Sequence, residues 1–407
     1  MGKKGVNQRQ IKSTNQSLII HEIRAAGSLS RSELAKKLML SAPSISSNID
    51  DLISRGVILE KGAGVSTMRG RKPISLEFNN SYGYVVAVDM VSSSTQVALA
   101  DLSGTNVLQL GYVDDALLIT ADVIERVMNM ISDMLEAHSI PGEKLYCICI
   151  GSPGIIEPRT GAITYAPRIR GMQGTALRDA FAERFRTEVI IKNDMNCSAV
   201  GELMFGSGTG YNHFINIQLD VGTGSGLILN GKLFEGRSGA AGEIGLWAMD
   251  FRDVMKRNEI GLLNIADYHV SVFGMLSKVK EQHPDVLEQF GEQDIDQHRI
   301  AEYAKVLFDA AKSGDKRVLT IIEEGVVVLG CVLQNIFSLL DLEAVIISGL
   351  MLEMDELFMK PLEQFLNANV SKNINVVHSA LGNKAVIYGA IGEAIHRVLD
   401  GIVSNEI

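Results

Sequence analysis

The sequence is poor in the features that mark secreted, disulfide-bonded or membrane proteins. It has only four cysteines and one tryptophan in 407 residues, which excludes a disulfide scaffold and fits a reducing compartment. The first sixteen residues contain no apolar run long enough for an export signal. The longest apolar stretch, 325–340, contains Gln334 and Asn335 and is short for a membrane span. We therefore expect a cytoplasmic protein without a membrane segment, in which this stretch is a helix buried in the core or at an interface.

Acidic and basic residues are unevenly distributed along the chain. Residues 1–80 contain 13 Lys and Arg against 6 Asp and Glu, whereas the remaining residues contain 25 against 42. The length of 407 residues predicts two or three domains. A basic head on an acidic body indicates a nucleic-acid-binding module joined to a domain with another task.

Residues 15–55 carry three short helical patterns with the spacing of a helix-turn-helix. The second pattern opens with Ser30 and Glu33, which are spaced as a capping box. Two strand-like runs, 57–60 and 74–78, follow the third pattern and are joined by a glycine turn and a polar stretch. This order predicts a helix-turn-helix followed by a wing.

The third helical pattern and the wing carry the residues expected to contact DNA. Short polar side chains lie near the N-terminus of the helix, facing away from its apolar stripe, where a recognition helix meets base edges and phosphates. Arginines flanking a glycine in the wing suit a narrow minor groove, with a solvated basic loop as the alternative. The predicted DNA-binding residues are Ser44, Ser46, Ser47 and Asn48 in the helix and Arg69, Arg71 and Lys72 in the wing. Residues 1–80 are thus predicted to form a winged helix-turn-helix DNA-binding domain.

From residue 83 onward, strand-like runs alternate with helical patterns such as 121–138 and 317–340. The order of paired strands followed by helices recurs after about residue 212. This pattern predicts mixed α/β sheets in two related lobes with a cleft between them. Cys147 and Cys149 are two apart in one strand-like run, so both should point to one face and lie in the core.

Five short motifs follow one another through the body. They are Gly151-Ser-Pro-Gly154, Lys192-Asn-Asp-Met-Asn196, Gly222-Thr-Gly-Ser-Gly226, Asn230-Gly-Lys-Leu-Phe-Glu-Gly236 and Gly239-Ala-Ala-Gly-Glu-Ile-Gly245. Their order and spacing resemble the ROK family of sugar kinases and transcriptional repressors, and the winged head is similar to the xylose-repressor and N-acetylglucosamine-repressor branch. The resemblance implies an α/β fold with an N-terminal winged helix-turn-helix followed by a two-lobed, actin-like (ribonuclease-H-like) ROK domain. We expect the first lobe at 82–194 plus about 383–407, and the effector-binding and oligomerisation lobe at 195–382.

The resemblance implies roles for three polar residues. In the kinases of the family, the aspartate that Asp194 matches is the general base that takes a proton from the sugar hydroxyl, a task that suits a carboxylate. Asn193 matches a sugar ligand, and Glu243 matches a carboxylate that grips sugar hydroxyls. We read Asp194 here as a ligand residue rather than a catalytic one. A structural role, such as a buried cap or an ion pair, is the alternative for all three.

Departures from the nucleotide loops of the family predict that kinase chemistry is lost. The first phosphate loop, Asp-x-Gly-Gly-Thr in the family, is Asp-Met-Val-Ser-Ser at 89–93, so that β-branched Val91 stands where the backbone should approach phosphate. Gly349 of the adenosine loop is kept without glycine neighbours, and only 222–226 survives well. Because phosphoryl transfer depends on positioning and charge stabilisation, we expect no enzymatic activity and no cofactor. The alternative is an ATP-dependent sugar kinase that carries a DNA-binding head.

Further departures concern the metal and the effector. Family members usually have a histidine after Gly-Glu-Ile-Gly and then a zinc-binding cysteine cluster, but Leu246 replaces that histidine and 247–263 contains neither Cys nor His. We therefore expect no metal site. Asn264 stands where the family has a sugar-binding glutamate, and Arg168 stands where an asparagine is usual. An arginine at a sugar site favours an anionic group, unless Arg168 points to solvent.

Together these expectations describe a sugar-responsive DNA-binding transcriptional regulator, a repressor of carbohydrate-metabolism genes. Its expected partners are operator DNA and a sugar or sugar-derivative effector, which is anionic if Arg168 contacts it. Two half-sites about one helical turn apart need two heads, so a homodimer is implied, with a tetramer as the alternative. A DNA-binding scaffold that has lost its ligand is a third hypothesis.

Overall fold

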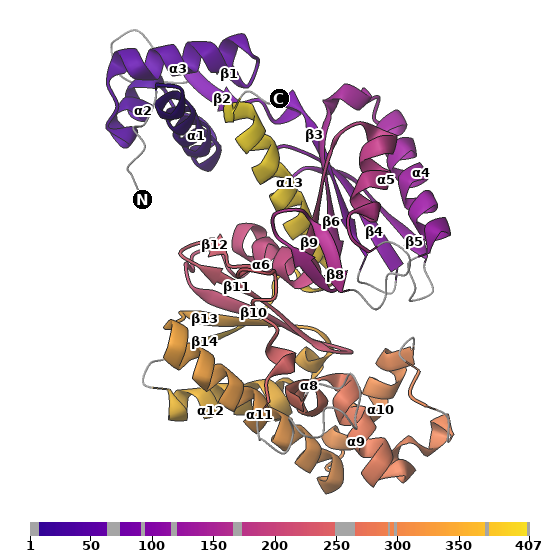
Figure 1. Cartoon of the computed structure of the whole chain (residues 1–407). Helices are drawn as coiled ribbons and strands as arrows, with labels where there is room; N and C mark the ends of the chain where they lie inside the picture. Colours follow the sequence, from indigo (N-terminus) through magenta and orange to yellow (C-terminus); the bar gives the residue numbers. More distant parts are fainter. Residues whose placement is uncertain are drawn as a thin grey trace.

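The computed structural model describes residues 8–62, 74–90, 94–114, 120–165, 173–248, 265–291, 294–296, 299–370 and 374–404. Within these ranges the chain forms a small N-terminal head and two α/β lobes that follow one another down the molecule (Figure 1). This arrangement confirms the predicted fold class, a winged helix-turn-helix followed by a two-lobed body.

The head is a three-helix unit with a two-stranded wing. Its elements are α1 (Gln8–Ala26), α2 (Arg31–Leu38), α3 (Ala42–Ser54), β1 (Ile58–Lys61) and the antiparallel β2 (Ser75–Phe78). The predicted capping box is present at α2, where the Ser30 side chain accepts from the Glu33 amide and the Glu33 carboxylate accepts from the Ser30 amide. The Ser41 side chain caps α3 through the amide of Ser44. α1 starts earlier than the predicted position 15.

The first lobe is built on a five-stranded sheet in the order β5-β4-β3-β6-β9. Its strands are β3 (Tyr84–Asp89), β4 (Ser94–Asp101), β5 (Val107–Asp114), β6 (Leu145–Ser152) and β9 (Glu188–Asn193), with a side hairpin of β7 (Ile155–Glu157) and β8 (Ala162–Tyr165). One face packs on α4 (Ala121–Ala137) and α5 (Ala176–Phe185), and the other packs on α6 (Asp194–Phe205) and α13 (Ala385–Ser404). Cys147 and Cys149 are fully buried on the α13 side, which confirms their prediction as core residues.

The second lobe repeats the strand arrangement of the first. Its order, β12-β11-β10-β13-β14, matches the first sheet position by position. In both, three strands form an antiparallel meander and two further strands run parallel to the first of them. The strands are β10 (Phe214–Leu219), β11 (Thr223–Leu229), β12 (Lys232–Leu233), β13 (Ala344–Ser348) and β14 (Asn375–His378). The helices on the core face are α8 (Ile265–Val270), α9 (Val272–Gln282), α10 (Ile300–Lys312), α11 (Lys316–Leu340) and α12 (Lys360–Asn369).

The apolar stretch 325–340 forms the C-terminal part of α11. By length and composition α11 is the one helix, among the residues that the structure describes, that could cross a membrane, and half of its most apolar window is buried inside the molecule. Leu329, Val332 and Leu333 of this stretch are at most 1% exposed and belong to the core of the second lobe. The prediction of a buried helix is confirmed.

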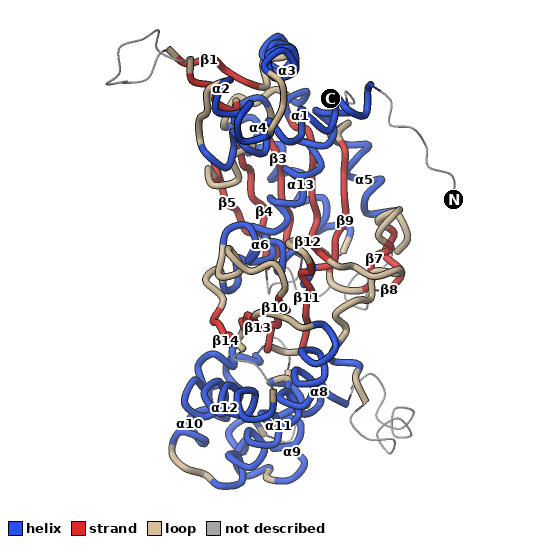
Figure 2. The backbone as a smooth tube through the Cα atoms, turned by 90° about the vertical axis from the view of Figure 1, so that its left-hand side faces the viewer, coloured by secondary structure: helices blue, strands red, loops and turns tan. Residues whose placement is uncertain are grey.

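α6 lies between the two sheets (Figure 2). Cys197 of α6 packs with α13 on the first sheet, whereas Ala199 packs with Phe214 and β11 of the second sheet. α6 and α13 are so close that a Cβ on Gly389 would lie 1.7 Å from the carbonyl oxygen of Cys197. No side chain fits at that point, so the crossing of the two helices depends on glycine.

The head and the first lobe share one hydrophobic core. Ile19 of α1 and Ile402 of α13 belong to the same cluster of buried apolar side chains. Two arginines add polar contacts: Arg24 donates to the carbonyl oxygen of Leu102 at 2.9 Å, and Arg55 donates to that of Ile402 at 2.6 Å. α13, drawn in yellow in Figure 1, therefore extends from the head to the level of α6.

Candidate effector cleft and nucleic-acid interface

The N-terminal turns of α3 carry the serines predicted to contact DNA. Ser47 is exposed, and Ser44 and Ser46 are half-buried. The sequence groups Asn48 with them, but its side chain is 6% exposed and donates to the carbonyl oxygen of Ser44 at 2.8 Å. Asn48 follows buried Ile45 by three residues, which places it at the edge of the apolar stripe. The outward orientation predicted for Asn48 is therefore wrong.

The turn between α2 and α3 exposes an apolar residue that sequence analysis did not single out. Met39 is 91% exposed and has a left-handed φ of 52°. A methyl-bearing side chain beside a recognition helix can contact the methyl group of thymine. The signal that could have found it is an apolar residue in the short segment between two helices. The predicted wing residues Arg69, Arg71 and Lys72 lie outside the described residues.

Asn193 sits at the N-terminus of α6 and joins two of the motifs. Its Oδ1 accepts from the amide of Asn196 at 2.9 Å, and its Nδ2 donates to the carbonyl oxygen of Gly154 at 2.9 Å. Asn193 is the N-cap of α6 and is 8% exposed. The structural alternative for this residue, a buried cap, is therefore present in the fold.

Three carboxyl groups gather beside that cap. Burial raises the pKa of Asp194 to about 7; the amide of Met195 opposes the shift by hydrogen bonding, and the charges of Asp89 and Glu243 add to it. Burial also raises the pKa of Glu243. Asp89, at the end of β3, is fully buried. With a pKa of about 7, the Asp194 carboxyl can both accept and donate hydrogen bonds near neutral pH, which suits the hydroxyl groups of a sugar.

A half-buried lysine links the two lobes close to this group. The Lys192 Nζ lies 2.9 Å from Glu235 Oε1 and 3.7 Å from Glu393 Oε2. Lys192 belongs to β9 of the first lobe, Glu235 follows β12 of the second lobe, and Glu393 lies on α13. Burial alone would lower the pKa of Lys192, but the two carboxylates outweigh it and raise that pKa. A change in the angle between the lobes would have to stretch or break the ion pair between Lys192 and Glu235.

The glycine turn of the second lobe follows β10. The Thr223 amide in this turn donates to Asp267 Oδ1 at 2.6 Å. Gly349, in the neighbouring turn after β13, has a left-handed φ of 100°, and a Cβ there would lie 2.4 Å from the carbonyl oxygen of Leu219. Sequence analysis missed Asp267, because it lies 44 positions along the chain from Thr223 and belongs to none of the motifs.

Several residues singled out by the sequence are not placed. Arg168, Asn264 and the first turn at 91–93 lie outside the described residues. Trp247 is half-buried and packs against the core of the second lobe, which agrees with the interpretation that packing holds the start of this loop. Leu246, at the position of the expected family histidine, is 39% exposed.

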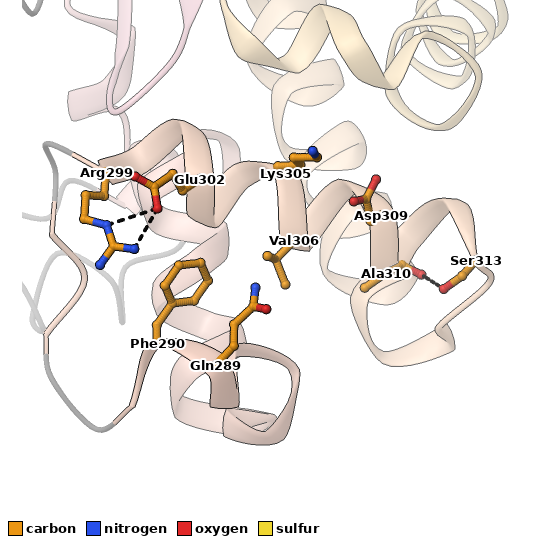
Figure 3. Close-up of a pocket in the computed structure, with 9 residues that line it drawn as sticks. All are labelled: Gln289, Phe290, Arg299, Glu302, Lys305, Val306, Asp309, Ala310 and Ser313. Carbon is orange, nitrogen blue, oxygen red and sulfur yellow. Dashed lines mark hydrogen bonds and ion pairs between the residues drawn. The ribbon is translucent and has the colours of Figure 1, made fainter.

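A surface groove of about 820 Å³ lies on the helices of the second lobe (Figure 3). Phe290 is one of its lining residues and stacks on Tyr303 with ring centroids 3.9 Å apart. Arg299 and Glu302 line it and pair with each other at 2.7 Å. None of its lining residues comes from the five motifs, so the groove is separate from the cleft.

The chain was compared with known proteins at the level of sequence. The model of the ROK family matches residues 85–396. A xylose repressor of Caldicellulosiruptor bescii is 28% identical over 406 residues, which cover 97% of this chain and 98% of that protein. The DNA-binding transcriptional dual regulator NagC of Escherichia coli is 26% identical over 405 residues, which cover 98% of this chain and 96% of that protein.

Solved structures share the fold. A ROK family transcriptional regulator, described as a homolog of the Escherichia coli MLC protein, has a TM-score of 0.79 at 22% identity and covers 98% of this chain and 100% of its own. A ROK family glucokinase from Streptomyces griseus, in complex with glucose and AMPPNP, has a TM-score of 0.59 at 24% identity and covers 77% of this chain and 100% of its own. The likeness to the regulator thus spans head and lobes, and the likeness to the kinase spans a smaller share of the chain.

Proposed function

Because the chain belongs to the ROK family, we propose that it is a sugar-responsive transcriptional repressor whose winged head binds operator DNA. The observation that carries the proposal is the position of α6: its N-terminus holds Asn193 and Asp194, and its side packs on α13, which shares a core with the head. The names of similar proteins, a xylose repressor and the regulator NagC, support this class. We propose that it acts in the cytoplasm on carbohydrate-metabolism genes.

The effector site lies where the motifs meet at α6. Asp194 and Glu243 offer half-buried carboxyls to sugar hydroxyls. Asn193 contributes the hydrogen-bonding capacity that its two capping bonds leave unused. We extend the site to Arg168 and Asn264 on the family pattern alone. If Arg168 lines the cleft, a sugar acid or sugar phosphate is preferred over a neutral sugar, because a guanidinium binds such groups with two hydrogen bonds.

The DNA site combines the recognition helix with the wing. Ser44, Ser46 and Ser47 lie at the exposed N-terminal part of α3, and Arg69, Arg71 and Lys72 extend the basic surface on the sequence pattern. We propose a homodimer on a two-fold operator, because half-sites in successive major grooves need two heads. A tetramer made of two such dimers is the alternative.

Effector and DNA sites are coupled through packed helices. α6 carries the effector residues at its N-terminus and crosses α13 at Gly389. α13 continues to the head, where Ile402 accepts from Arg55. A ligand that changes the lobe angle would therefore change the direction of the heads, with a coupling free energy of about 1 to 3 kcal/mol if it is typical.

A working kinase is the second candidate, and one observation favours it. The pKa of Asp194 is about 7, which is the range where a general base works well near neutral pH. The glycine-free sequence at 89–93 argues against it, as does the carboxylate of Asp267 at the second turn. We propose that the lobes bind a ligand without transferring phosphate.

One panel of measurements tests the proposal. Operator DNA is selected from a random library with the full chain, and sugars, amino sugars, sugar acids and sugar phosphates are screened by thermal shift and by their effect on operator binding. We expect one carbohydrate to raise the melting temperature of the wild type and to change operator affinity, and Glu243→Gln to lose both effects. Glu302→Gln, at an exposed carboxylate of the same lobe, is the matched control and should keep both.

Two results would overturn the proposal. A chain that binds no DNA sequence selectively is not a repressor, and operator affinity that no carbohydrate changes means a ligand-free scaffold. ATP-dependent phosphorylation of a sugar by the wild type, abolished in Asp194→Asn, would establish the kinase instead.

A further inference from the structure

The glycine turn of the second lobe is in contact with a carboxylate of the chain itself, that of Asp267. Residues 220–222 form the turn between β10 and β11, and Thr223 is the first residue of β11. Backbone amides at a glycine turn of this kind can bind an anionic ligand. The Thr223 amide donates to Asp267 Oδ1 at 2.6 Å. A Cβ on Gly222 would lie 3.8 and 4.0 Å from the two carboxylate oxygens of Asp267. The carboxylate therefore lies against the turn itself.

The position of Asp267 is fixed by the backbone around it. Asp267 belongs to α8, whose Ala266 amide donates to the carbonyl oxygen of Trp247 at 3.2 Å. The carbonyl oxygen of Asp267 accepts from the amide of Ser271 at 2.9 Å, and Ser271 in turn caps α9. The carboxylate cannot move off the turn without a change in these contacts or in its own rotamer.

The neighbouring turn is occupied in the same way. The Leu350 amide, which follows Gly349, donates to Asp220 Oδ1 at 2.9 Å. The other carboxylate oxygen of Asp220 accepts from the side-chain amide of Gln218 at 2.7 Å. The two glycine turns, after β10 and after β13, thus each have an amide bonded to a carboxylate of the chain. A phosphate group that approached them would meet negative charge instead of free N–H groups.

We propose that Asp267 is a built-in substitute for a phosphate group, which holds the second glycine turn in its bound shape and excludes nucleotides from the cleft. This inference rests on the proposed function, because it explains how a kinase-like cleft can respond to a sugar alone. Because the Asp267 carboxylate already occupies the turn, the lobes can close without a bound nucleotide. Repressor activity is then independent of the ATP concentration.

Burial raises the pKa of Asp267, and the hydrogen bond from Thr223 opposes that shift. The carboxyl is thus held in place at some cost in solvation, and the Thr223 amide compensates part of it. Removal of the carboxyl should free the amide and remove the charge in one step. Asp267→Ser does both, whereas Asp267→Asn keeps an oxygen that can accept from Thr223 and removes only the charge.

The test is the binding of magnesium pyrophosphate to the full chain by calorimetry. This probe needs the second turn but neither the adenosine loop nor a sugar. We expect negligible binding to the wild type and to Asp309→Ser, which removes an exposed carboxylate of the same lobe. Asp267→Ser should bind at least about tenfold more tightly than the wild type, and Asp267→Asn by a smaller factor, because one hydrogen bond still competes. Gly222→Ala in the Asp267→Ser background should remove the gain.

A folded Asp267→Ser with the pyrophosphate affinity of the wild type would overturn the inference, as would tight binding of pyrophosphate or ATP to the wild type. If Asp267→Ser does not fold, the wild type still tests it through amide hydrogen exchange of Thr223. Fast exchange there would show that the hydrogen bond to Asp267 does not hold the turn. Sugar and operator binding are measured on the same samples. If the wild type binds neither a sugar nor an operator, the proposed function is refuted. If the wild type binds both but Asp267→Ser binds pyrophosphate no more tightly than the wild type, only the role of Asp267 is refuted.

Discussion

The two lobes have the same strand order and different chemistry at equivalent turns. The central strand of each sheet leads to an aspartate, Asp89 at the end of β3 and Asp220 directly after β10. After Asp220 the chain enters the glycine motif 222–226, whereas after Asp89 it has Val91 and serines. Apolar strands determine the topology, and a few turn residues determine which ligand the topology can hold. Fold and ligand chemistry are therefore separate conclusions in this molecule.

The lobes also differ in what their cores include. The core of the first lobe continues into the head through α1 and α13, whereas that of the second lobe is enclosed by its own helices. The head is therefore mechanically part of the first lobe. The second lobe is joined to the first through α6 and the ion pair Lys192–Glu235, and we propose that it is the part whose angle changes when effector binds. The following experiments test that division, beginning with the largest expected effect.

Adding a side-chain atom where α6 and α13 cross should have the largest effect on stability. In Gly389→Ala the new Cβ would lie 1.7 Å from a backbone oxygen of α6, and backbone cannot yield as a flexible side chain can. We expect a loss of about 3 kcal/mol or more in the free energy of unfolding, measured by urea denaturation. Gly142→Ala is the matched control, since nothing lies within 4 Å of its new Cβ. Equal stabilities of the two variants would contradict the tight crossing.

The second effect is a pH dependence that originates at the cleft. With a pKa of about 7 in the fold against 3.8 in its absence, Asp194 binds more protons when folded, so stability falls as pH rises from about 4 to about 7. Asp194→Asn lacks this loss and should be more stable than the wild type by on the order of 2 to 4 kcal/mol at pH 8. The difference should vanish below pH 4. Urea unfolding at several pH values measures it, with Asp309→Asn as a control for the loss of one charge.

A smaller effect is expected at the joint between head and first lobe. Arg24 donates to Leu102 and lies over the Phe78 ring at 5.4 Å. Arg24→Met keeps the apolar stem but loses the hydrogen bond, so we expect about 1 to 2 kcal/mol less stability. Operator affinity without effector should change little, while the response to effector should weaken. Arg126→Met, at an exposed position of α4, should leave the response intact. A similar loss of response in Arg126→Met would contradict a specific role of the Arg24 contacts.

The smallest effect is expected on the far side of the second lobe. Glu302 pairs with Arg299 at an exposed position beside the groove of Figure 3. Exposed ion pairs contribute little because water screens them. Glu302→Ala should leave the melting temperature and the effector response unchanged. A changed response would mean that the groove takes part in regulation.

Much of the fold follows from local patterns in the sequence. The capping box at Ser30 and Glu33 and the strands around Cys147 are short-range features, and the structure has them where the sequence predicts them. The predicted orientation of Asn48 is wrong because a side chain at the edge of an apolar stripe can point either to solvent or to the core. Its hydrogen bond to the carbonyl oxygen of Ser44 keeps it buried. A pattern gives the face of a helix only to within one position.

Only the site residues that belong to a motif could be predicted from the sequence. The motifs that contain Asn193 and Gly154 could be aligned with a family, but their hydrogen bond joins residues 39 positions apart. Asp267 has no motif, and its contact with Thr223 depends on how α8 packs on the second lobe. Long-range contacts of this kind arise from tertiary packing, which no local spacing encodes.

The place of α13 has a consequence for synthesis of the chain. Residues 385–404 complete a core that begins with α1 and β3, and the whole second lobe is made between these parts. Domains generally fold as units during synthesis, the N-terminal one first. The head can therefore fold early, but the part of its docking surface that α13 supplies exists only after the second lobe has been made. A chain truncated before residue 385 would contain the helix-turn-helix but not the α13 side chains that pack against it. We expect proteases to degrade such a chain before it can bind an operator.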